Sequence, residues 1–219
     1  MKDLHMHTRF SDGNDGIKTM AAEAHRLGLK QIAITDHVWR SSQWFDAYRQ
    51  EIHQANSLYD DMDILVGFEA KALSVNGEID ATDRMCMRAD IRLGAIHRIP
   101  KGEMPNVYFS REEIAENQKE AYANWVKTTC NMIQNRHVDI IAHPCMVIDK
   151  YQLEVNMADV YQIVVSARKN NTKLEISGRY KEANRYLFDL LKEDPSLYDV
   201  FSFGSDAHTV AELKKSHHV

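Results

Sequence analysis

Short apolar segments alternate with longer amphipathic ones along the chain, and this alternation restricts the folds that it can adopt. Most of the short segments are rich in Ile, Val or Phe, and they lie at residues 3–5, 31–35, 63–68, 91–96, 138–142, 173–176 and 200–203. Apolar segments too short for surface helices are typical of strands buried on both faces of a sheet. We therefore predict seven strands, joined through helices by right-handed crossovers into a parallel sheet.

The longer segments carry apolar residues at helical spacing. Residues 17–27 place them at positions 17, 20, 21, 24 and 27, on one face of a helix, and Gly28 follows as a stop signal. The sequence Ser-Arg-Glu-Glu at residues 110–113 is a capping box, which predicts a helix through about residue 132. Further helices are predicted at residues 157–167 and 183–191.

Metal-ligand side chains follow strand after strand. His5 and His7 follow the first predicted strand, and the same kind of residue recurs after the others, at Asp36-His37, Glu69, His97, His143 and Asp206 with His208. Each residue alone is explained most simply by a structural role, but the recurrence favours one shared site. In a β/α barrel the carboxyl ends of all strands meet at one mouth, where active sites lie. A closed or nearly closed barrel is therefore favoured, with an open, doubly wound sheet as the alternative.

The residue types in this set predict a metal centre. Imidazole and carboxylate ligands without thiolates suit Zn²⁺, Mn²⁺ or Fe²⁺, whereas Mg²⁺ prefers oxygen ligands. His5 and His7 are two apart on a strand, so they point to the same side, and Asp12 lies on the loop just beyond. Nine candidates exceed the needs of one ion, so we expect several ions. The candidates are His5, His7, Asp12, His37, Glu69, His97, His143, Asp206 and His208.

The net charge and the cysteines indicate which binding partners and which cellular compartment to expect. The formal net charge of −5 gives no basic face for a nucleic-acid backbone, so it disfavours a long nucleic acid but leaves a small nucleotide open. The three cysteines, Cys86, Cys130 and Cys145, are odd in number and form no CxxC pair, so we expect a reduced, cytoplasmic protein.

The start and end of the sequence add two expectations. The first ten residues contain no apolar segment, so we expect no signal peptide, and no apolar run approaches a membrane span of about 20 residues. We interpret residues 1–219 as one domain, and His217 and His218 as tail residues outside the metal site.

The order of these motifs resembles that of the PHP family, named for polymerase and histidinol phosphatase. The resemblance runs from residue 3 to residue 208. It is carried by His5-Met-His7, Ser-Asp12-Gly, Ile-Thr-Asp36-His37, Gly-Phe-Glu69, Gly-Ala-Ile-His97, Ile-Ala-His143-Pro and Gly-Ser-Asp206-Ala-His208.

The resemblance implies a distorted (β/α)₇ barrel, similar to a TIM barrel, with a trinuclear site at the carboxyl ends of the strands. By this resemblance the first ion is held by His5, His7, Glu69 and Asp206. Glu69 also bridges to the second ion, which is completed by His97 and His143. The third ion is held by Asp12, His37 and His208. Asp36 does not bind an ion itself but orients one of the ligands through a hydrogen bond.

Such a site predicts a metal-dependent phosphoesterase. A hydroxide that bridges two ions attacks phosphorus, while the ions neutralise the phosphate oxygens. Glu69 holds the ions, and His208 or a metal-bound water protonates the leaving group. The segment Leu-Glu-Ile-Ser-Gly-Arg179 resembles stand-alone histidinol phosphatases, which places Arg179 at the substrate phosphate. Arg98 and Arg9 follow strands at the same mouth and are weaker candidates for substrate binding.

Three functions are compatible with the predicted metal centre and the arginines beside it. The leading one is hydrolysis of a small-molecule phosphate monoester similar to histidinol phosphate, with two or three bound Zn, Mn or Fe ions. The second is a phosphodiesterase or exonuclease that acts on nucleotides or short oligonucleotides. The third is a non-catalytic metal-binding module, which the complete ligand set disfavours.

Overall fold

Parallel strands form the frame of the molecule. The computed structural model describes residues 1–217, so His218 lies outside the described residues. The main strands pair in the order β1-β2-β4-β5-β6-β7-β8, all parallel. They are β1 Lys2–Asp3, β2 Gln31–Ile34, β4 Asp63–Lys71, β5 Ile91–Ala95, β6 Ile140–Ala142, β7 Lys173–Ser177 and β8 Phe201–Gly204. The seven predicted strands are confirmed, and a short β3 (His37–Val38) that the sequence did not predict pairs with β4.

The two edges of this sheet meet. The backbone N–H of Leu4 donates to the carbonyl of Phe203 (3.1 Å), and that of Asp206 donates to the carbonyl of His5 (2.9 Å). The backbone N–H of His7 donates to the carbonyl of Ala207 (2.9 Å). These bonds join the segments that continue β1 and β8, so the sheet is nearly closed. The predicted distorted (β/α)₇ barrel is confirmed, and the open-sheet alternative is excluded.

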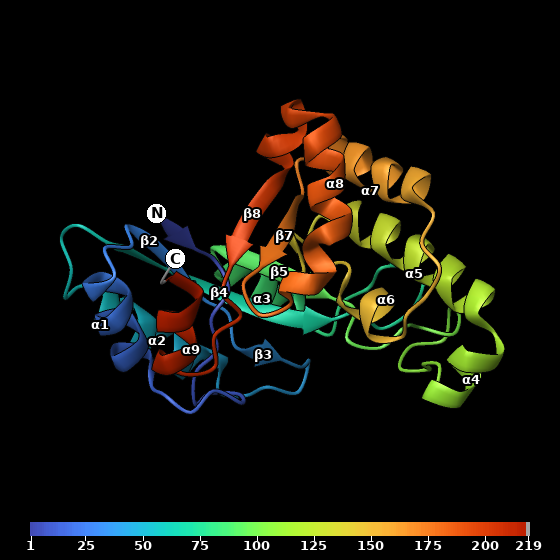
Figure 1. Ribbon diagram of the computed structural model, residues 1–219. Helices are drawn as coiled ribbons and strands as arrows, with labels where there is room; N and C mark the ends of the chain where they lie inside the picture. The colour runs from blue at the N-terminus through green and yellow to red at the C-terminus, as the bar shows by residue number, and fades with distance from the viewer. Residues whose placement is uncertain (218–219) are drawn as a thin grey trace.

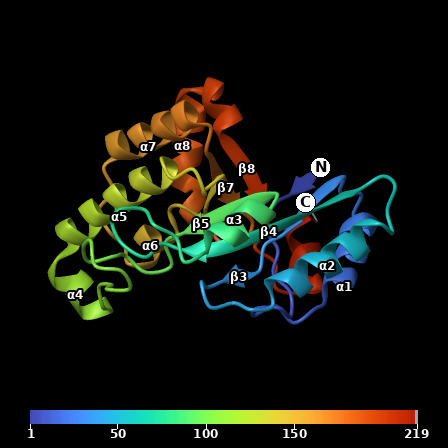
Figure 2. The same cartoon turned by 180° about the vertical axis from the view of Figure 1, so that it is seen from behind.

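Helices cover the outside of the barrel. They are α1 Ile17–Arg26, α2 Phe45–Asn56, α3 Asp83–Arg88, α4 Arg111–Glu116, α5 Gln118–Ile133, α6 Met146–Lys150, α7 Met157–Asn170, α8 Arg185–Glu193 and α9 Val210–His217, with the 3₁₀ turns η1 Lys181–Asn184 and η2 Pro195–Val200. Figures 1 and 2 show α1, α2 and α9 grouped on one side, and α5, α7 and α8 on the other. Among the described residues, no helix is long and apolar enough to cross a membrane.

The helix predictions need three corrections. The segment 110–132 forms two helices, because Asn117 leaves the helical conformation (φ −129°, ψ 45°) between α4 and α5. The capping box of Ser110 and Glu113 is present as predicted. The segment 183–191 begins as the 3₁₀ turn η1 and becomes α-helical at Arg185. Helices α2, α3, α6 and α9 were not predicted.

His217 is not a tail residue, so that prediction is wrong. Its Nε2 lies 2.8 Å from Asp3 Oδ2, and only 6% of its side chain is exposed. The cause is α9, which packs against α1 and carries His217 back to the buried carboxylate of Asp3. Asp3 also accepts the N–H of Ser205 (2.9 Å), so this carboxylate helps to close the barrel between β1 and β8.

A buried tyrosine fixes the point where β2 ends. Tyr48 Oη lies 2.6 Å from the carbonyl of Ile34 and 2.9 Å from that of Gly67, and it accepts the N–H of Asp36 (3.3 Å). Buried carbonyls need such partners. The hydroxyl therefore supports the turn from which Asp36 and His37 project.

Candidate metal centre

All nine predicted ligands gather at the carboxyl ends of the strands. Each one has a nitrogen or carboxylate oxygen within 3.8 Å of another member of the set. The residues come from six different strand ends or the loops that follow them. Barrel closure thus brings together side chains that are far apart in sequence, as the barrel prediction required.

Two of these residues sit on strained backbone. His143, directly after β6, has φ +34°, and Asp206, after β8, has φ +55°. Non-glycine residues rarely adopt positive φ, and such conformations persist where surrounding contacts hold them. Here the N–H of His143 donates to Glu175 Oε2 (2.7 Å), and that of Asp206 donates to the carbonyl of His5. These bonds hold the sharp turns that direct both side chains into the cluster.

Glu69, on β4, lies at the centre of the cluster. Its Oε1 is 2.9 Å from His143 Nε2 and 3.2 Å from His97 Nε2. Its Oε2 is 2.8 Å from His37 Nδ1, and 3.6 Å from Nε2 of both His5 and His7. The side chain is only 1% exposed. A single carboxylate with imidazoles around both oxygens has the position of a bridge between two cations.

The ligand atoms form three overlapping groups. In each group one ligand atom from every residue lies within 4.8 Å of the others; the groups are His5, His7 and Asp206; His37, Glu69 and His97; and His7, Asp12, His37 and His208. The groups broadly follow the three ions that the family resemblance implies. They differ in that His37 and His7 each belong to two groups, and in that Glu69 belongs only to the group of His37 and His97, although its Oε2 lies 3.6 Å from Nε2 of both His5 and His7. His143 reaches the cluster through Glu69.

The donor set fits cations. Among the described residues, His7 Nδ1, Glu69 Oε2 and His143 Nδ1 are buried and have no hydrogen-bond partner. Glu69 Oε2 is close to three imidazole nitrogens without hydrogen-bond geometry to any of them. Buried polar atoms without partners are costly. Cations bound in the cluster would provide partners for Glu69 Oε2, which faces Nε2 of His5 and His7, and for His7 Nδ1, which faces Asp12. The mixture of nitrogen and oxygen donors suits Zn²⁺, Mn²⁺ or Fe²⁺.

The electrostatics of the cluster favour charged carboxylates. Burial alone would raise the pKa of Glu69, but the nearby His97 and His5 outweigh it and hold that pKa well below its usual range. Burial lowers the pKa of His7 to about 4, and the neighbouring His5 adds to this shift. Burial also opposes charge on His37, but the adjacent carboxylates of Asp12 and Glu69 outweigh it and raise the pKa of His37 to about 10. The carboxylates are therefore ionised and attract positive charge.

Glu175, in the middle of β7, was not predicted as a site residue. It is buried, and its Oε1 lies 2.7 Å from His5 Nδ1 while its Oε2 accepts the N–H of His143. One carboxylate thus orients two candidate ligands from different strands. The available signal in the sequence was a charged residue inside an apolar strand, in Leu-Glu-Ile. Gly204 leaves the necessary space, because a Cβ there would lie 2.0 Å from Glu175 Oε1.

Asp36 acts on a loop rather than on a ligand ring. Its carboxylate accepts hydrogen bonds from the N–H and hydroxyl of Thr8 (2.8 and 2.7 Å) and of Ser11 (3.1 and 2.6 Å). Ser11 precedes Asp12, and its hydroxyl also accepts the N–H of His37 (3.2 Å). Asp36 therefore fixes the loop that presents Asp12.

Arg179 lies beside the candidate ligands, as the sequence suggested. Its Nη1 is 3.0 Å from His208 Nδ1, 3.3 Å from the carbonyl of Asp206 and 3.4 Å from Glu212 Oε2. The other two arginines are farther from the chemistry: Arg98 stacks on the ring of Tyr108 at 5.0 Å, and Arg9 donates to the carbonyl of Asn14. Within residues 1–217, neither makes a polar contact with a candidate ligand.

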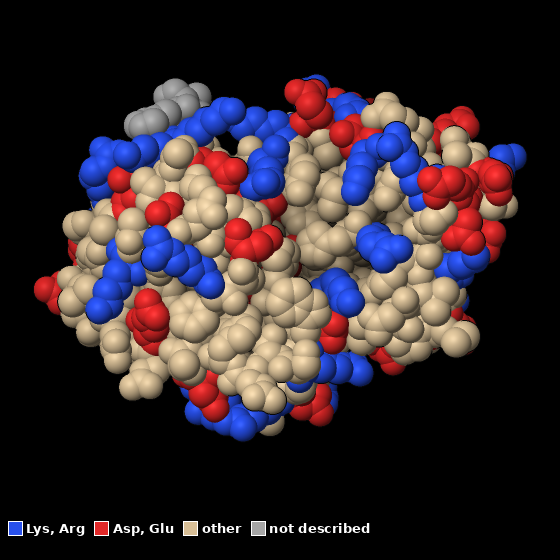
Figure 3. Space-filling view, turned by 90° about the horizontal axis from the view of Figure 1, so that it is seen from below, with Lys and Arg blue, Asp and Glu red and all other residues tan. Residues whose placement is uncertain are grey.

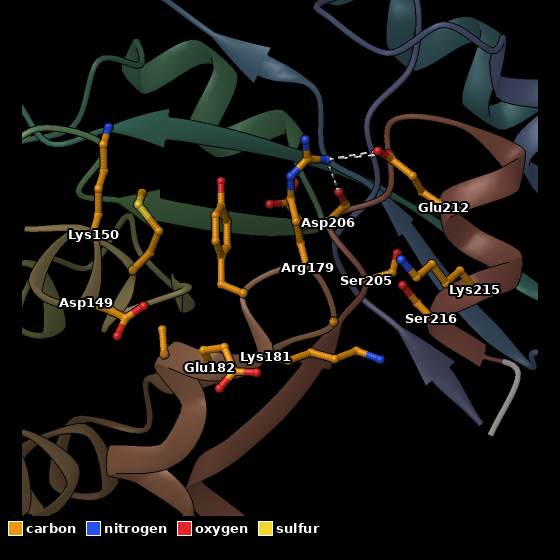
Figure 4. Close-up of a pocket in the computed structure, with 14 residues that line it drawn as sticks. Asp149, Lys150, Arg179, Lys181, Glu182, Ser205, Asp206, Glu212, Lys215 and Ser216 are labelled. Carbon is orange, nitrogen blue, oxygen red and sulfur yellow. Dashed lines mark hydrogen bonds and ion pairs between the residues drawn. The ribbon is translucent and has the colours of Figure 1, made fainter.

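A cavity adjoins the cluster at Asp206. It has a volume of about 590 Å³ and is lined by α6, the loop after β7, the segment after β8, and α9 (Figure 4). Figure 3 shows that the underside of the molecule is hollowed near its centre, with Lys and Arg side chains around the hollow. Cavities of this size accommodate small molecules.

The sequence matches known proteins over most of its length. A family model described as the PHP domain matches residues 3–186. The DNA polymerase/3′-5′ exonuclease PolX of Bacillus subtilis (strain 168) is 29% identical over 96% of this chain, which spans only 35% of that protein. A protein of Proteus mirabilis (strain HI4320) named as a probable phosphatase is 27% identical, over 96% of this chain and 80% of that protein.

The fold also has a solved counterpart. The crystal structure of a candidate histidinol phosphatase from Listeria monocytogenes superposes with a TM-score of 0.73 at 18% identity, covering 97% of each chain. This likeness extends past residue 186 and so includes the part of the barrel that carries Asp206 and His208. The match to the PHP domain model over residues 3–186 shows that the chain belongs to the PHP family of metal-dependent phosphoesterases.

Proposed function

We propose that this enzyme hydrolyses a phosphate monoester of a small molecule, with a compound similar to histidinol phosphate as one candidate. The observation that carries the proposal is the position of Arg179. Its guanidinium contacts His208 and lines a cavity that also contains Asp206. A guanidinium forms strong, directional bonds with phosphate oxygens. The similarity to a probable phosphatase of Proteus mirabilis supports the same activity.

The nine clustered residues would bind two or three divalent ions of Zn, Mn or Fe. Glu69 has the central position that a bridging ligand needs. When bound, such ions would neutralise phosphate oxygens and lower the pKa of water near the phosphorus atom. Glu175 orients the ring of His5, and Asp36 holds the loop that presents Asp12, so both carboxylates position the proposed ligands.

The remaining roles belong to side chains around the phosphate. Arg179 binds its oxygens beside His208, whose Nδ1 lies 3.0 Å from Arg179 Nη1 and accepts its N–H. Because His208 Nε2 would hold an ion, both ring nitrogens of His208 are engaged, and the leaving oxygen takes its proton from water. Arg9 and Arg98 are proposed as secondary contacts at the edge of the mouth, because both follow strands that end there. Neither contacts a candidate ligand among the described residues, whereas Arg179 Nη1 lies 3.0 Å from His208 Nδ1, so each is expected to contribute less than Arg179.

A second function is supported by one specific observation. The similarity to the Bacillus subtilis protein named as a polymerase and 3′-5′ exonuclease covers nearly all of this chain, which favours a phosphodiesterase or exonuclease acting on nucleotides or short oligonucleotides. The two functions differ in the charge of the scissile group. A terminal phosphate carries nearly two negative charges near neutral pH, whereas a diester carries one.

The test compares the two ester classes directly. The protein, loaded in turn with Zn²⁺, Mn²⁺ and Fe²⁺, is assayed with p-nitrophenyl phosphate and bis(p-nitrophenyl) phosphate. We expect a higher kcat/KM for the monoester. A higher kcat/KM for the diester, together with shortening of a short oligonucleotide, would favour the exonuclease, and no hydrolysis of either with any metal would contradict both.

A further inference from the structure

In the described part of the chain, several positive side chains that line the cavity beside Asp206 have no acidic partner. Besides Arg179, its wall contains Lys150, Lys181 and Lys215. All three lysines are exposed, and no ion pair joins any of them to an acid within the described residues 1–217. The ammonium of Lys150 lies over the ring of Tyr151, 5.4 Å from its centroid.

Most acids of the same wall are already engaged. Asp149 pairs with Arg185 and Glu212 with Arg179, while Asp206 belongs to the cluster of candidate ligands and lies 3.8 Å from His5 Nε2. Glu212 also accepts the N–H of His208 (2.7 Å). Glu182 is thus the one acid of this wall that is left to balance three lysines. The outer part of the cavity therefore has a positive potential, while its inner end contacts the metal cluster at Asp206.

Two of the lysines come from segments that pack closely. A Cβ on Gly178 would lie 3.2 Å from Ser216 Oγ and 3.1 Å from Ser205 Cα. This close approach joins the loop after β7, which leads to Lys181, to the last turn of α9, which carries Lys215. In Figure 4 both lysines extend toward the side of Ser205 and Ser216, whereas Lys150 stands on the opposite side.

We propose that the outer part of this cavity binds a second anionic group of the substrate, a phosphate or a carboxylate. The substrate class would then be small phosphate monoesters of about sugar size that carry another negative charge, such as sugar bisphosphates or phosphorylated sugar acids. This inference rests on the proposed phosphomonoesterase function. The scissile phosphate lies at Arg179 and the cluster, and the second group lies at Lys181 and Lys215.

The same charges disfavour a cationic substrate. The amine of a compound such as histidinol phosphate would face ammonium groups of like charge, which lowers affinity. An anionic group would instead form hydrogen bonds with charged donors, each of which contributes substantially to binding. Lys181 and Lys215 would therefore favour phosphate monoesters with a second anionic group over those with an amine, which Arg179 alone cannot distinguish.

A set of six-carbon sugar phosphates of similar size, which differ in the charge of the second group, tests the inference. The set is glucosamine 6-phosphate, glucose 6-phosphate, 6-phosphogluconate and glucose 1,6-bisphosphate, whose second groups are cationic, neutral, carboxylate and phosphate. The last two also show which kind of anion is preferred. We expect kcat/KM to rise from the cationic to the anionic members by roughly tenfold or more.

The double variant Lys181→Gln/Lys215→Gln should lower kcat/KM for the anionic substrates by roughly 10- to 100-fold, mainly through KM, and much less for glucose 6-phosphate. Lys214→Gln is the matched control, because Lys214 is the neighbouring residue on α9 and pairs instead with Glu23 (3.8 Å). It should leave the ranking of the substrates unchanged.

The outcomes distinguish this inference from the proposed function. Hydrolysis of p-nitrophenyl phosphate without preference among the six-carbon sugar phosphates would overturn the inference and keep the function. An equal loss on all substrates in the double variant would also overturn it. If nothing is hydrolysed, calorimetry of glucose 1,6-bisphosphate and glucose 6-phosphate with the metal-loaded protein still decides, because equal affinities would contradict the second anion site.

Discussion

His5 Nδ1 and Glu175 Oε1 lie 2.7 Å apart, and both side chains are buried. The bond leaves His5 Nε2 directed at His7, Glu69 and Asp206, which are 3.0, 3.6 and 3.8 Å away. The other oxygen of Glu175 holds the backbone of His143. The carboxylate that organises these ligands therefore belongs to a strand that supplies no candidate ligand.

We predict that Glu175→Gln weakens metal binding by roughly 10- to 100-fold while the barrel stays folded. The reason is that both oxygens of Glu175 are in use, and an amide has only one acceptor oxygen. Calorimetric titration of the metal-free protein with Zn²⁺, and the absorption spectrum of the Co²⁺ form, measure the effect without an activity assay.

Two further variants control this experiment. Glu193→Gln, at the exposed end of α8, should leave metal affinity unchanged. Gly204→Ala should reproduce the defect, because the added Cβ would displace Glu175. Normal affinity in both Glu175→Gln and Gly204→Ala would show that Glu175 does not position the ligands.

Glu69→Gln should nearly abolish hydrolysis and leave the fold intact. Glu69 faces histidines at both oxygens, so an amide there removes charge from the centre of the cluster. Asp36→Asn disturbs only the loop of Thr8 and Ser11, so the rate of hydrolysis should fall less in this variant, by roughly 10- to 100-fold. Steady-state rates at saturating metal compare the two, and substantial activity in Glu69→Gln would refute the assigned bridge.

Removal of metal should abolish hydrolysis and lower the melting temperature. Ions that bind only the folded chain stabilise it by mass action. Elemental analysis after reconstitution should give two or three transition ions per chain, and thermal melts with and without chelator should differ. Fewer than one ion per chain would contradict the proposed centre.

Arg179→Ala should lower kcat/KM for phosphate monoesters by roughly 10- to 150-fold, mainly through KM, because it removes a charged hydrogen bond of about 1.5–3 kcal/mol. Diesters should be affected less. Arg168→Ala is the control, since Arg168 pairs with Asp199 on the surface (3.6 Å). An equal effect of Arg179→Ala on monoesters and diesters would count against a role in recognition of the terminal phosphate.

The native thiols should react slowly with Ellman's reagent at pH 8. Burial raises the pKa of Cys145 to about 12, and it raises the pKa of Cys86 and Cys130 as well. A raised pKa leaves little thiolate, the reactive form, at that pH. All three thiols should react quickly in denaturant, and fast reaction of Cys145 in the folded protein would contradict its burial.

The sequence alone was sufficient to predict the barrel and the candidate side chains that gather at the carboxyl ends of its strands. The apolar segments and the helical spacing between them are local signals, and strands joined by helices are constrained to parallel order. Glu69, His97 and His143 were predicted together because each follows a predicted strand, and the carboxyl ends of barrel strands meet. In the structure β4 extends through Glu69 to Lys71. Boundaries were less predictable, as the break at Asn117 shows, because a local pattern does not specify where a helix is interrupted.

Only the tertiary structure decided which groups touch. Glu175 and His5 are 170 residues apart in sequence, and Asp3 and His217 are 214 apart. Such contacts depend on strand order and barrel closure, which no local pattern encodes. The cavity has the same origin, since α6, the loop after β7 and α9 must pack together before Lys150, Lys181 and Lys215 can surround one space.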